Sequence, residues 1–191
     1  MITSTANQKI KRILKLQKKA KARNEEGIFI VEGIRMMKEA PESRIKELYI
    51  SETFLQKYPD LPEHLKKKAE MVSDPVFAHM SDTKTPQGIL GVIRRMSWTM
   101  DELLHGEDGR APFLMVLDHL QDPGNLGTIF RTAEGAGVTG VILGSNCADL
   151  YQPKVIRSTM GSIYRMRAVC VDDMKETVRL LKQHGIHTYA A

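Results

Sequence analysis

Residues 113–137 read FLMVLDHLQDPGNLGTIFRTAEGAG. The apolar run at 113–117 has the length of a buried strand, and the pattern from Asn125 to Gly135 indicates a helix. The loop between them, 121–127, therefore lies where open α/β sheets place their ligands. This stretch predicts a parallel-sheet α/β domain with a ligand site at the mouth of a helix.

The loop 121–127 has features that suit an anion. Pro123 stiffens the chain, Gly124 and Gly127 permit close backbone approach, and the helix N-terminus offers amide groups. The spacing Gly124-x-x-Gly127 is neither the G-x-G-x-x-G of dinucleotide-binding folds nor a Walker P-loop. A nucleotide-binding oxidoreductase is therefore disfavoured.

The helix after this loop carries three polar candidates for chemistry: Asn125, Arg131 and Glu134. The i, i+3 spacing predicts that Glu134 lies beside Arg131. Asn125 points roughly 120° away from Arg131, so the two share a site only if Asn125 reaches in from the helix mouth. The alternatives are a solvated Arg–Glu pair and an Asn that merely caps the helix.

The alternation of strands and helices continues to the end of the chain. Strands are expected at 138–143, 164–171 and 186–189, and helices at 153–160 and 173–184. Strands separated by helices imply right-handed crossovers and a parallel sheet.

The N-terminal half predicts a smaller α/β sandwich of roughly 100 residues. Its first helix buries Ile10, Ile13, Leu14 and Gln17, with Thr5 and Gln8 as a capping box. Further strands are expected at 28–31, 47–50, 70–73 and 88–94, and helices at 34–40, 53–58, 64–68 and 75–80. In this half, Glu32 and Arg35 are expected to pair at i, i+3, and Met36 and Met37 to lie in the core.

The residues between 95 and 110 are polar and irregular, which indicates a connection between domains. The contributing residues are Arg95, Ser97, Asp101, Glu102, Glu107, Asp108 and Gly109. The expected division is a first domain at 1–98, a linker at 99–110 and a second domain at 111–191.

The charge distribution indicates a polyanionic partner. The net charge is +5 and the pI about 9.2, and residues 1–23 contain basic residues without a single acid. We name as candidate phosphate ligands Lys9, Lys11, Arg12, Lys15, Lys18, Lys19 and Arg23, together with Lys154 and Arg157 near the ligand edge of the parallel sheet. The alternative is a solvated helix face.

Cysteine content and hydropathy exclude several classes of protein. Cys147 and Cys170 are far apart and have no partners at metal-ligand spacing, so neither a disulfide framework nor a metal site is expected. A reducing cytoplasm fits this content. Because no apolar run approaches the ~18 residues of a membrane helix, no membrane partner is expected.

Four segments of the chain resemble, in order, the SpoU/TrmH family of RNA ribose 2′-O-methyltransferases. The segment DPGNLGTIFRTAEGAG (122–137) is similar to the first signature motif of the family, and YQPKVIRSTMGSIYRM (151–166) to the helix and strand that follow it. FIVEGIRMMKEA (29–40) and TKTPQGILGVI (83–93) resemble the family's small N-terminal substrate-binding domain, itself similar to ribosomal proteins that bind bent RNA.

The resemblance implies methylation of ribose 2′-hydroxyls in structured RNA, ribosomal rather than transfer RNA, with S-adenosylmethionine as cofactor. In this view Arg131 grips the adjacent phosphate and stabilises the developing alkoxide. Asn125 positions the ribose or Arg131, and Glu134 orients the guanidinium. The alternative is a non-catalytic RNA-binding protein.

The chain departs from the family pattern at its end. The second and third motifs, a G-x-E-x-x-G loop and a stretch near S-L-N-V-S, do not occur before Ala191. In the family these motifs form the knotted C-terminus that holds the donor. We therefore expect a fragment or a truncated gene product with an incomplete methyltransferase domain. The sequence therefore predicts no donor-binding residues. It also does not decide whether this chain forms the homodimer expected of the full-length family.

Overall fold

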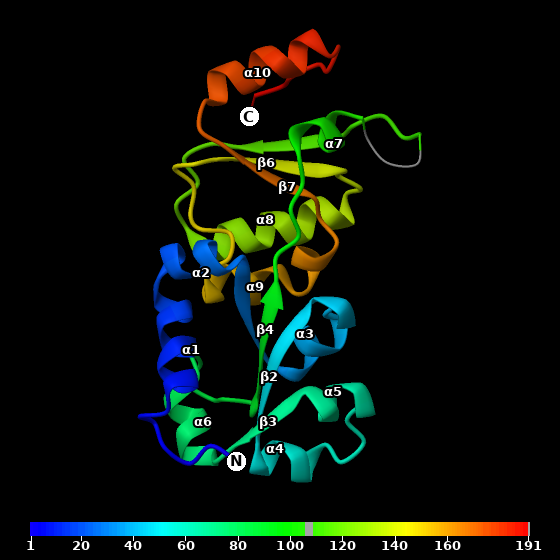
Figure 1. The fold of residues 1–191 in the computed structure, drawn as a ribbon. Coiled ribbons are helices and arrows are strands. Elements are labelled where there is room, and N and C mark those ends of the chain that lie inside the picture. Colours follow the sequence, from blue (N-terminus) through cyan, green and yellow to red (C-terminus); the bar gives the residue numbers. More distant parts are fainter. Residues whose placement is uncertain (106–108, 191) are drawn as a thin grey trace. The chain divides into compact units, whose positions relative to one another are not determined.

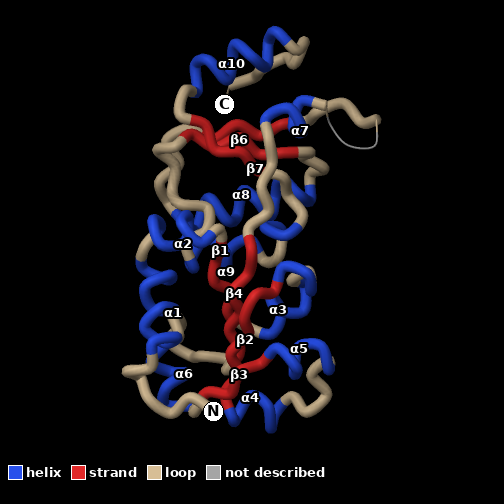
Figure 2. The backbone as a smooth tube through the Cα atoms, in the orientation of Figure 1, coloured by secondary structure: helices blue, strands red, loops and turns tan. Residues whose placement is uncertain are grey.

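The structure is a computed structural model that describes residues 1–105 and 109–190. Glu107 and Asp108 of the predicted linker lie outside the described residues. The chain divides into two compact units, one of Met1–Arg95 with Tyr151–Arg157 and one of Met96–Leu150 with Ser158–Ala191. Each unit combines a sheet with helices, as Figures 1 and 2 show.

The first unit is built on a four-stranded sheet of order β1-β4-β2-β3. The strands are β1 (Ile28–Glu32), β2 (Ile45–Ser51), β3 (Ala69–Val72) and β4 (Ile89–Arg94). β4 runs antiparallel to both neighbours, with Ile30 opposite Val92 and Leu48 opposite Gly91, whereas β2 and β3 are parallel. Consequently β1 and β2, which follow each other in the chain, do not pair, and β4 fills the place between them.

Helices cover both faces of this sheet (Figure 1). One face carries α1 (Gln8–Lys18), α2 (Ala20–Glu26) and α6 (Asp74–Met80); the other carries α3 (Ile34–Glu39), α4 (Glu52–Lys57) and α5 (Glu63–Lys68), with a short 3-10 turn η1 (Glu42–Arg44) before β2. Ile13 and Leu16 are fully buried on the first face. Met36 and Met37 are buried as predicted, Met37 on the opposite face against Gly91. The α/β sandwich expected for the N-terminal half is confirmed.

The start of α1 differs from the prediction. The N-cap is Asn7, whose side chain accepts a hydrogen bond from the Lys9 amide at 2.9 Å. The predicted Thr5–Gln8 capping box is wrong because the Asn7 amide donates to the Ser4 carbonyl, so the chain turns before Asn7 and the helix begins at Gln8. Its buried face includes Leu16, which the sequence pattern missed.

The second unit contains a parallel sheet of order β5-β6-β7, as expected. The strands are β5 (Leu114–Leu117), β6 (Gly140–Gly144) and β7 (Ala168–Val171). One face is covered by α8 (Pro123–Gly135), the other by α7 (Met100–Leu104) and α10 (Met174–Gln183), as Figure 1 shows. Leu103, Ile142 and Leu181 join α7, β6 and α10 in one core cluster. The remaining elements are α9 (Pro153–Thr159), whose residues to Arg157 group with the first unit, and the 3-10 turn η2 (Ser162–Tyr164).

Two segments near the ends of this unit contradict the sequence-based expectation. The predicted irregular stretch contains α7, which begins with a capping box: Thr99 accepts from the Glu102 amide, and the Glu102 carboxylate accepts from the Thr99 amide. Leu103 is buried, and Met100 and Leu104 pack against the same core cluster. The polar residues before and after this single apolar turn concealed it in the sequence. The strand predicted at 186–189 is also wrong, because Ile186 alone packs against the core cluster while Tyr189 is 94% exposed.

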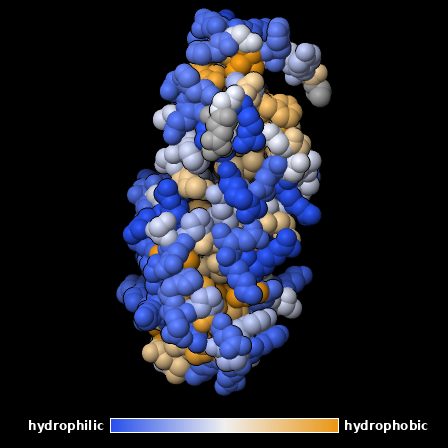
Figure 3. All heavy atoms as spheres, turned by 90° about the vertical axis from the view of Figure 1, so that its right-hand side faces the viewer, coloured by the Kyte–Doolittle hydropathy of each residue, from blue (hydrophilic) through white to orange (hydrophobic). Residues whose placement is uncertain are grey.

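The surface in view in Figure 3 is mainly hydrophilic, with hydrophobic residues in small separate groups. Among the described residues, no helix has the length and apolar character needed to span a bilayer. Apolar residues are instead gathered between each sheet and its helices.

Candidate functional site

The helix α8 begins earlier than the sequence suggested. Asp122 is its N-cap, and its carboxylate accepts a hydrogen bond from the Asn125 amide at 2.7 Å. Pro123 occupies the first turn, where its missing N–H has no cost. One of the amides that the loop was expected to offer to an anion is therefore already bound by the chain's own carboxylate.

The periodicity of α8 separates a buried face from an exposed one. Leu126, Phe130 and Ala133 are buried. Asn125 and Arg131 both lie on the exposed side, although their directions differ by roughly 120° on an ideal helix. The geometry therefore permits both to contact one large ligand lying along the helix.

Arg131 and Asn125 are available to a ligand. Within the described part of the chain, the Arg131 guanidinium forms no hydrogen bond or ion pair, and the side-chain amide of Asn125 forms none either. Since both side chains are exposed, water satisfies them in this state. A ligand would displace that water without breaking an internal contact.

Glu134 has a different partner from the one predicted. Its carboxylate accepts hydrogen bonds from Arg165, one at Nε and one at Nη2 with a length of 3.2 Å. The expected pair with Arg131 is wrong because Glu134 borders the buried side of α8, where it faces the chain just after η2. Arg165 was missed by the sequence analysis because it lies 31 residues from Glu134, beyond any helical spacing.

A cavity of about 300 Å³ opens at the carboxyl ends of β5, β6 and β7. Its lining consists of Asp118, His119, Gly144, Asn146, Asp172, Asp173, Met174 and Lys175. His119 has a positive φ of 55°, and one ring nitrogen lies 2.7 Å from Asn146 Nδ2. The position agrees with the expected ligand edge of a parallel sheet.

This cavity fits only part of S-adenosylmethionine. Its three carboxylates, from Asp118, Asp172 and Asp173, suit ribose hydroxyls and a cationic sulfonium. The lining residues also include the imidazole ring of His119 and the side chain of Met174, which suit contact with an adenine, and Lys175, which offers a cation to the donor's own carboxylate. Three of the eight lining residues are acidic, so the described residues supply part of a donor site rather than a complete one.

Several of the predicted basic ligands in the first unit are held by acids. Lys9 Nζ lies 2.5 Å from Glu70, and Arg12 bridges Glu26 at 2.5 Å and Glu47 at 2.9 Å. The hydrogen bond from Arg12 is the main cause of a lowered pKa for the Glu26 carboxyl, and the same bond raises the pKa of Arg12. These cations stabilise the packing of α1.

Arg23 is buried rather than presented to a ligand. It is 2% exposed, and its Nη1 donates to the carbonyls of Leu16 at 2.5 Å and Gln17 at 2.9 Å, where α1 ends. In contrast, a group of four exposed lysines forms no ion pair with any described residue: Lys11, Lys15, Lys18 and Lys19. The first three recur at i, i+4 and i+7, which places them on one side of α1.

The remaining residues predicted to bind phosphate or to pair with each other differ in their surroundings. Lys154 is exposed on α9, and Arg157 donates from Nη1 to Asp82 at 2.8 Å. The expected Glu32–Arg35 pair is wrong: Glu32 accepts from the hydroxyls of Ser81 and Thr83, while Arg35 lies 3.7 Å from Glu39.

Both halves of the chain match known families. Residues 112–191 match the SpoU rRNA methylase family, and residues 7–91 match the MRM3-like substrate-binding domain. The two matched regions contain α8 with Arg131 and α1 with its lysines, respectively.

Curated relatives are RNA methyltransferases by name. The 23S rRNA (guanosine(2553)-2′-O)-methyltransferase RlmP of Bacillus subtilis is 33% identical, with 98% of this chain and 71% of the relative covered. Human mitochondrial rRNA methyltransferase 3 is 31% identical over 84% of this chain. The chain spans 39% of the human relative and 58% of a tRNA/rRNA methyltransferase from Synechocystis.

Solved structures share the fold. An rRNA methyltransferase from Sinorhizobium meliloti superposes with a TM-score of 0.77 at 26% identity, covering 95% of this chain and 68% of its own. A crystal structure described as an RNA 2′-O ribose methyltransferase gives a TM-score of 0.71 at 27% identity, covering 96% of this chain and 70% of its own.

Proposed function

The chain belongs to the SpoU rRNA methylase family, and from that premise we propose that the protein methylates ribose 2′-hydroxyls in structured RNA, with S-adenosylmethionine as donor. The observation that carries the proposal is the exposed Arg131, which has no hydrogen-bond or ion-pair partner among the described residues and lies on α8 within the matched region. The names of the relatives favour ribosomal over transfer RNA. An AdoMet-bound form of the Sinorhizobium enzyme shares the fold and supports the donor.

A ribose 2′-hydroxyl is a weak nucleophile, so it has to be held in line and lose its proton as it attacks. The guanidinium of Arg131 stays protonated in proteins and is therefore not the base. Its role is to hold the neighbouring phosphate and to stabilise negative charge on the attacking oxygen. Asn125, exposed on the same helix, positions the ribose through its free amide.

The role of Glu134 changes with the structure. Because its carboxylate holds Arg165, Glu134 fixes this second guanidinium about one helical turn from Arg131. The Arg165 side chain is 50% exposed, which leaves it accessible to a phosphate. We therefore assign Glu134 and Arg165 to RNA positioning, with Arg131 as the group at the reacting oxygen.

The proposal also gives each domain of the chain a role. Residues 1–98 serve as the substrate-binding domain and 111–191 as part of the methyltransferase domain, joined near 99–110. The lysines 11, 15, 18 and 19 contact RNA phosphates, with Lys154 as an additional contact. We further propose that the full-length protein forms the homodimer expected of the family and acts in the cytoplasm, which the cysteine content suits.

The test is Arg131→Ala in the full-length protein, with transfer of radiolabelled methyl groups from S-adenosylmethionine to ribosomal RNA as readout. We expect a loss of at least about 100-fold in methyl transfer, the size typical of removing one charge-stabilising group. RNA affinity changes by less than about threefold, because other phosphate contacts persist.

Arg179→Ala is the matched control, because Arg179 is exposed on α10 and forms a surface pair with Glu176. Full activity of Arg131→Ala would contradict the catalytic assignment. A wild-type protein that binds RNA, transfers no methyl group and gives no heat with S-adenosylmethionine in calorimetry would favour the alternative, a non-catalytic RNA-binding protein.

A further inference from the structure

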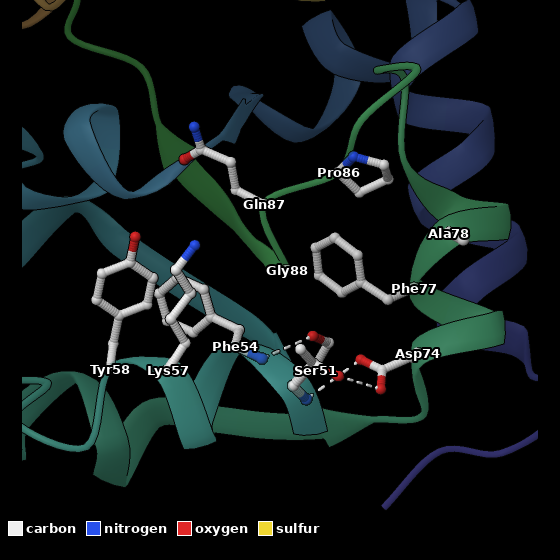
Figure 4. A pocket seen from close by; sticks show the side chains of 11 residues that line it. Ser51, Phe54, Lys57, Tyr58, Asp74, Phe77, Ala78, Pro86, Gln87 and Gly88 are labelled. Carbon is white, nitrogen blue, oxygen red and sulfur yellow. Dashed lines mark hydrogen bonds between the residues drawn. The ribbon is translucent and has the colours of Figure 1, made fainter.

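A cavity of about 460 Å³ lies in the first unit between α4, α6 and the segment that leads into β4 (Figure 4). Its volume is within the ~300–1,000 Å³ range of sites for small ligands. The methyl-transfer proposal above gives it no role. Its lining is Ser51, Thr53, Phe54, Lys57, Tyr58, Asp74, Phe77, Ala78, Pro86, Gln87 and Gly88, which we call the base pocket.

Aromatic rings form the apolar part of the base pocket. The ring centroids of Phe54 and Tyr58 are 4.7 Å apart, and Phe77 directs its ring into the cavity from α6 (Figure 4). Phe54 and Phe77 are each 1% exposed, so the surrounding core holds them rigidly. Phe54 and Phe77 thus form a rigid apolar floor, and Tyr58, the partly exposed aromatic residue of the lining, offers a ring on which a planar ligand can stack.

Hydrogen-bond donors lie on one side of the base pocket. Gln87 Oε1 accepts from the Ile34 amide at 2.9 Å, which fixes the side chain and leaves its NH₂ group to donate. The Lys57 amine forms no ion pair with a described residue and lies 5.8 Å from the Tyr58 ring centroid. Figure 4 shows the ends of the Gln87, Lys57 and Tyr58 side chains on the same side of the base pocket.

An acceptor lies on the other side. The Asp74 carboxylate accepts from the Thr53 hydroxyl at 2.6 Å and from the Thr53 amide at 3.3 Å. The hydroxyl bond is the main cause of a lowered pKa for the Asp74 carboxyl. Because a carboxylate has about four acceptor sites, Asp74 keeps capacity for a ligand N–H.

The shape of the base pocket depends on Gly88. Its φ is +88°, and a Cβ there would lie 2.5 Å from Ser51 Oγ and 2.6 Å from Phe54 Cβ. Only glycine lets the segment before β4 approach α4 so closely. The backbone thus holds Gln87 opposite Asp74.

We propose that the base pocket binds one unpaired nucleobase of an RNA. The base stacks on Tyr58 above the floor formed by Phe54 and Phe77, Gln87 and Asp74 bond its polar edge, and Lys57 contacts the attached phosphate. Proteins recognise single-stranded RNA by this combination of stacking and edge contacts. A neighbouring cavity of about 160 Å³ shares Lys57 and Tyr58 with the base pocket and is also lined by Lys38 and Asp60, so its two lysines outnumber its single acid.

The inference rests on the proposed function in one respect, that the chain acts on RNA. Its test compares variants of the chain by fluorescence anisotropy with a short mixed-sequence single-stranded RNA and with the duplex of the same sequence. Ala78→Phe fills the mouth of the base pocket from an exposed position of α6, and Lys57→Met removes the cation. Matched controls are His79→Phe and Lys67→Met, exposed residues that line neither cavity.

We expect Ala78→Phe to weaken single-strand binding about tenfold, as loss of one stacked base does. Lys57→Met weakens it about threefold, and both leave duplex binding and the controls unchanged. In the wild-type chain, RNA that carries 4-thiouridine cross-links to peptides containing residues 51–58 or 86–88. This last readout requires no variant to fold.

Two outcomes overturn different claims. Unchanged single-strand affinity in folded Ala78→Phe and Lys57→Met, or cross-links confined to the lysines of α1, would reject the base pocket and leave the methyl-transfer proposal intact. Absence of RNA binding by the wild-type chain would reject the proposed function and the pocket together.

Discussion

The helix α1 and the exposed face of α8 both carry arginine, yet the two arginines have opposite environments. Arg12 on α1 lies between the carboxylates of Glu26 and Glu47, whereas Arg131 on α8 meets no acid among the described residues. The run of basic residues around Arg12 was the more conspicuous signal in the sequence. The difference teaches that charge density along the sequence does not reveal which cations are held by internal acids and which remain available to a ligand.

The largest effect on stability is expected in α8, where a buried residue that supports the fold lies next to an exposed residue proposed to act on the substrate. Phe130 is fully buried next to the exposed Arg131. Phe130→Ala should lower the free energy of unfolding by about 3–5 kcal/mol through the cavity it leaves. Arg131→Ala should change it by less than about 0.5 kcal/mol. Urea denaturation measures both, and equal losses would abolish the distinction between the two faces of α8.

A smaller effect is expected for the buried arginine of the first unit. Arg23→Met keeps the side-chain volume but leaves the carbonyls of Leu16 and Gln17 without their donor. The expected loss of unfolding free energy is about 2–3 kcal/mol. Lys21→Met, an exposed neighbour, serves as control with a change below about 0.5 kcal/mol. If Arg23→Met instead weakened RNA binding at unchanged stability, the structural assignment of Arg23 would fail.

The Arg12 network gives a pH-dependent contribution. Arg12→Ala should cost about 1 kcal/mol at pH 7, since the pairs are only partly buried. The folded-state pKa of Glu26 is lowered, chiefly by the hydrogen bond from Arg12. The stabilisation is therefore present above the unfolded pKa of about 4.3 and lost as the pH falls through the lower folded value. Denaturation of wild type and variant at pH 7 and pH 3 should show the difference shrinking; a constant difference would contradict it.

The smallest effect on stability is expected for the unpaired lysines of α1. Replacing Lys11, Lys15 and Lys18 with Ala should change the unfolding free energy by less than about 0.5 kcal/mol. The slope of log affinity against log salt for RNA should fall by about 2 to 3, if each lysine contacts one phosphate. Binding measured across a salt series checks this. An unchanged slope would return these lysines to a merely solvated face.

Much of the fold followed from local patterns. The apolar run at 113–117 and the periodic helix after it placed β5 and α8 correctly, because burial on one side imposes a period that can be read without tertiary information. The short helix α7 was missed because its apolar residues, Met100, Leu103 and Leu104, span only about one turn, which is too short to show a repeated period. The strand expected at 186–189 does not form. An alternating sequence pattern can predict a strand, but it does not provide a neighbouring strand for it to pair with.

The candidate site was predicted only in part. Arg131 and Asn125 came from the motif, and the structure leaves both exposed. The partnership of Glu134 with Arg165 joins residues that only the tertiary fold brings together. The base pocket draws its lining from segments around Ser51, Asp74 and Gln87, each unremarkable in sequence. Pairings between distant segments depend on how helices pack on a sheet, which local propensity does not specify.

The strand order of the first unit also determines when that unit can form. β4 is the last of its four strands along the chain but occupies a central place, between β1 and β2. Ile28 has to find Arg94, so closing the sheet brings together backbone far apart in the chain. Such non-local pairing slows folding, and a nascent chain has to expose the edges of β1 and β2 until β4 has emerged from the ribosome. Assembly of this sheet is thus set by its last strand rather than its first.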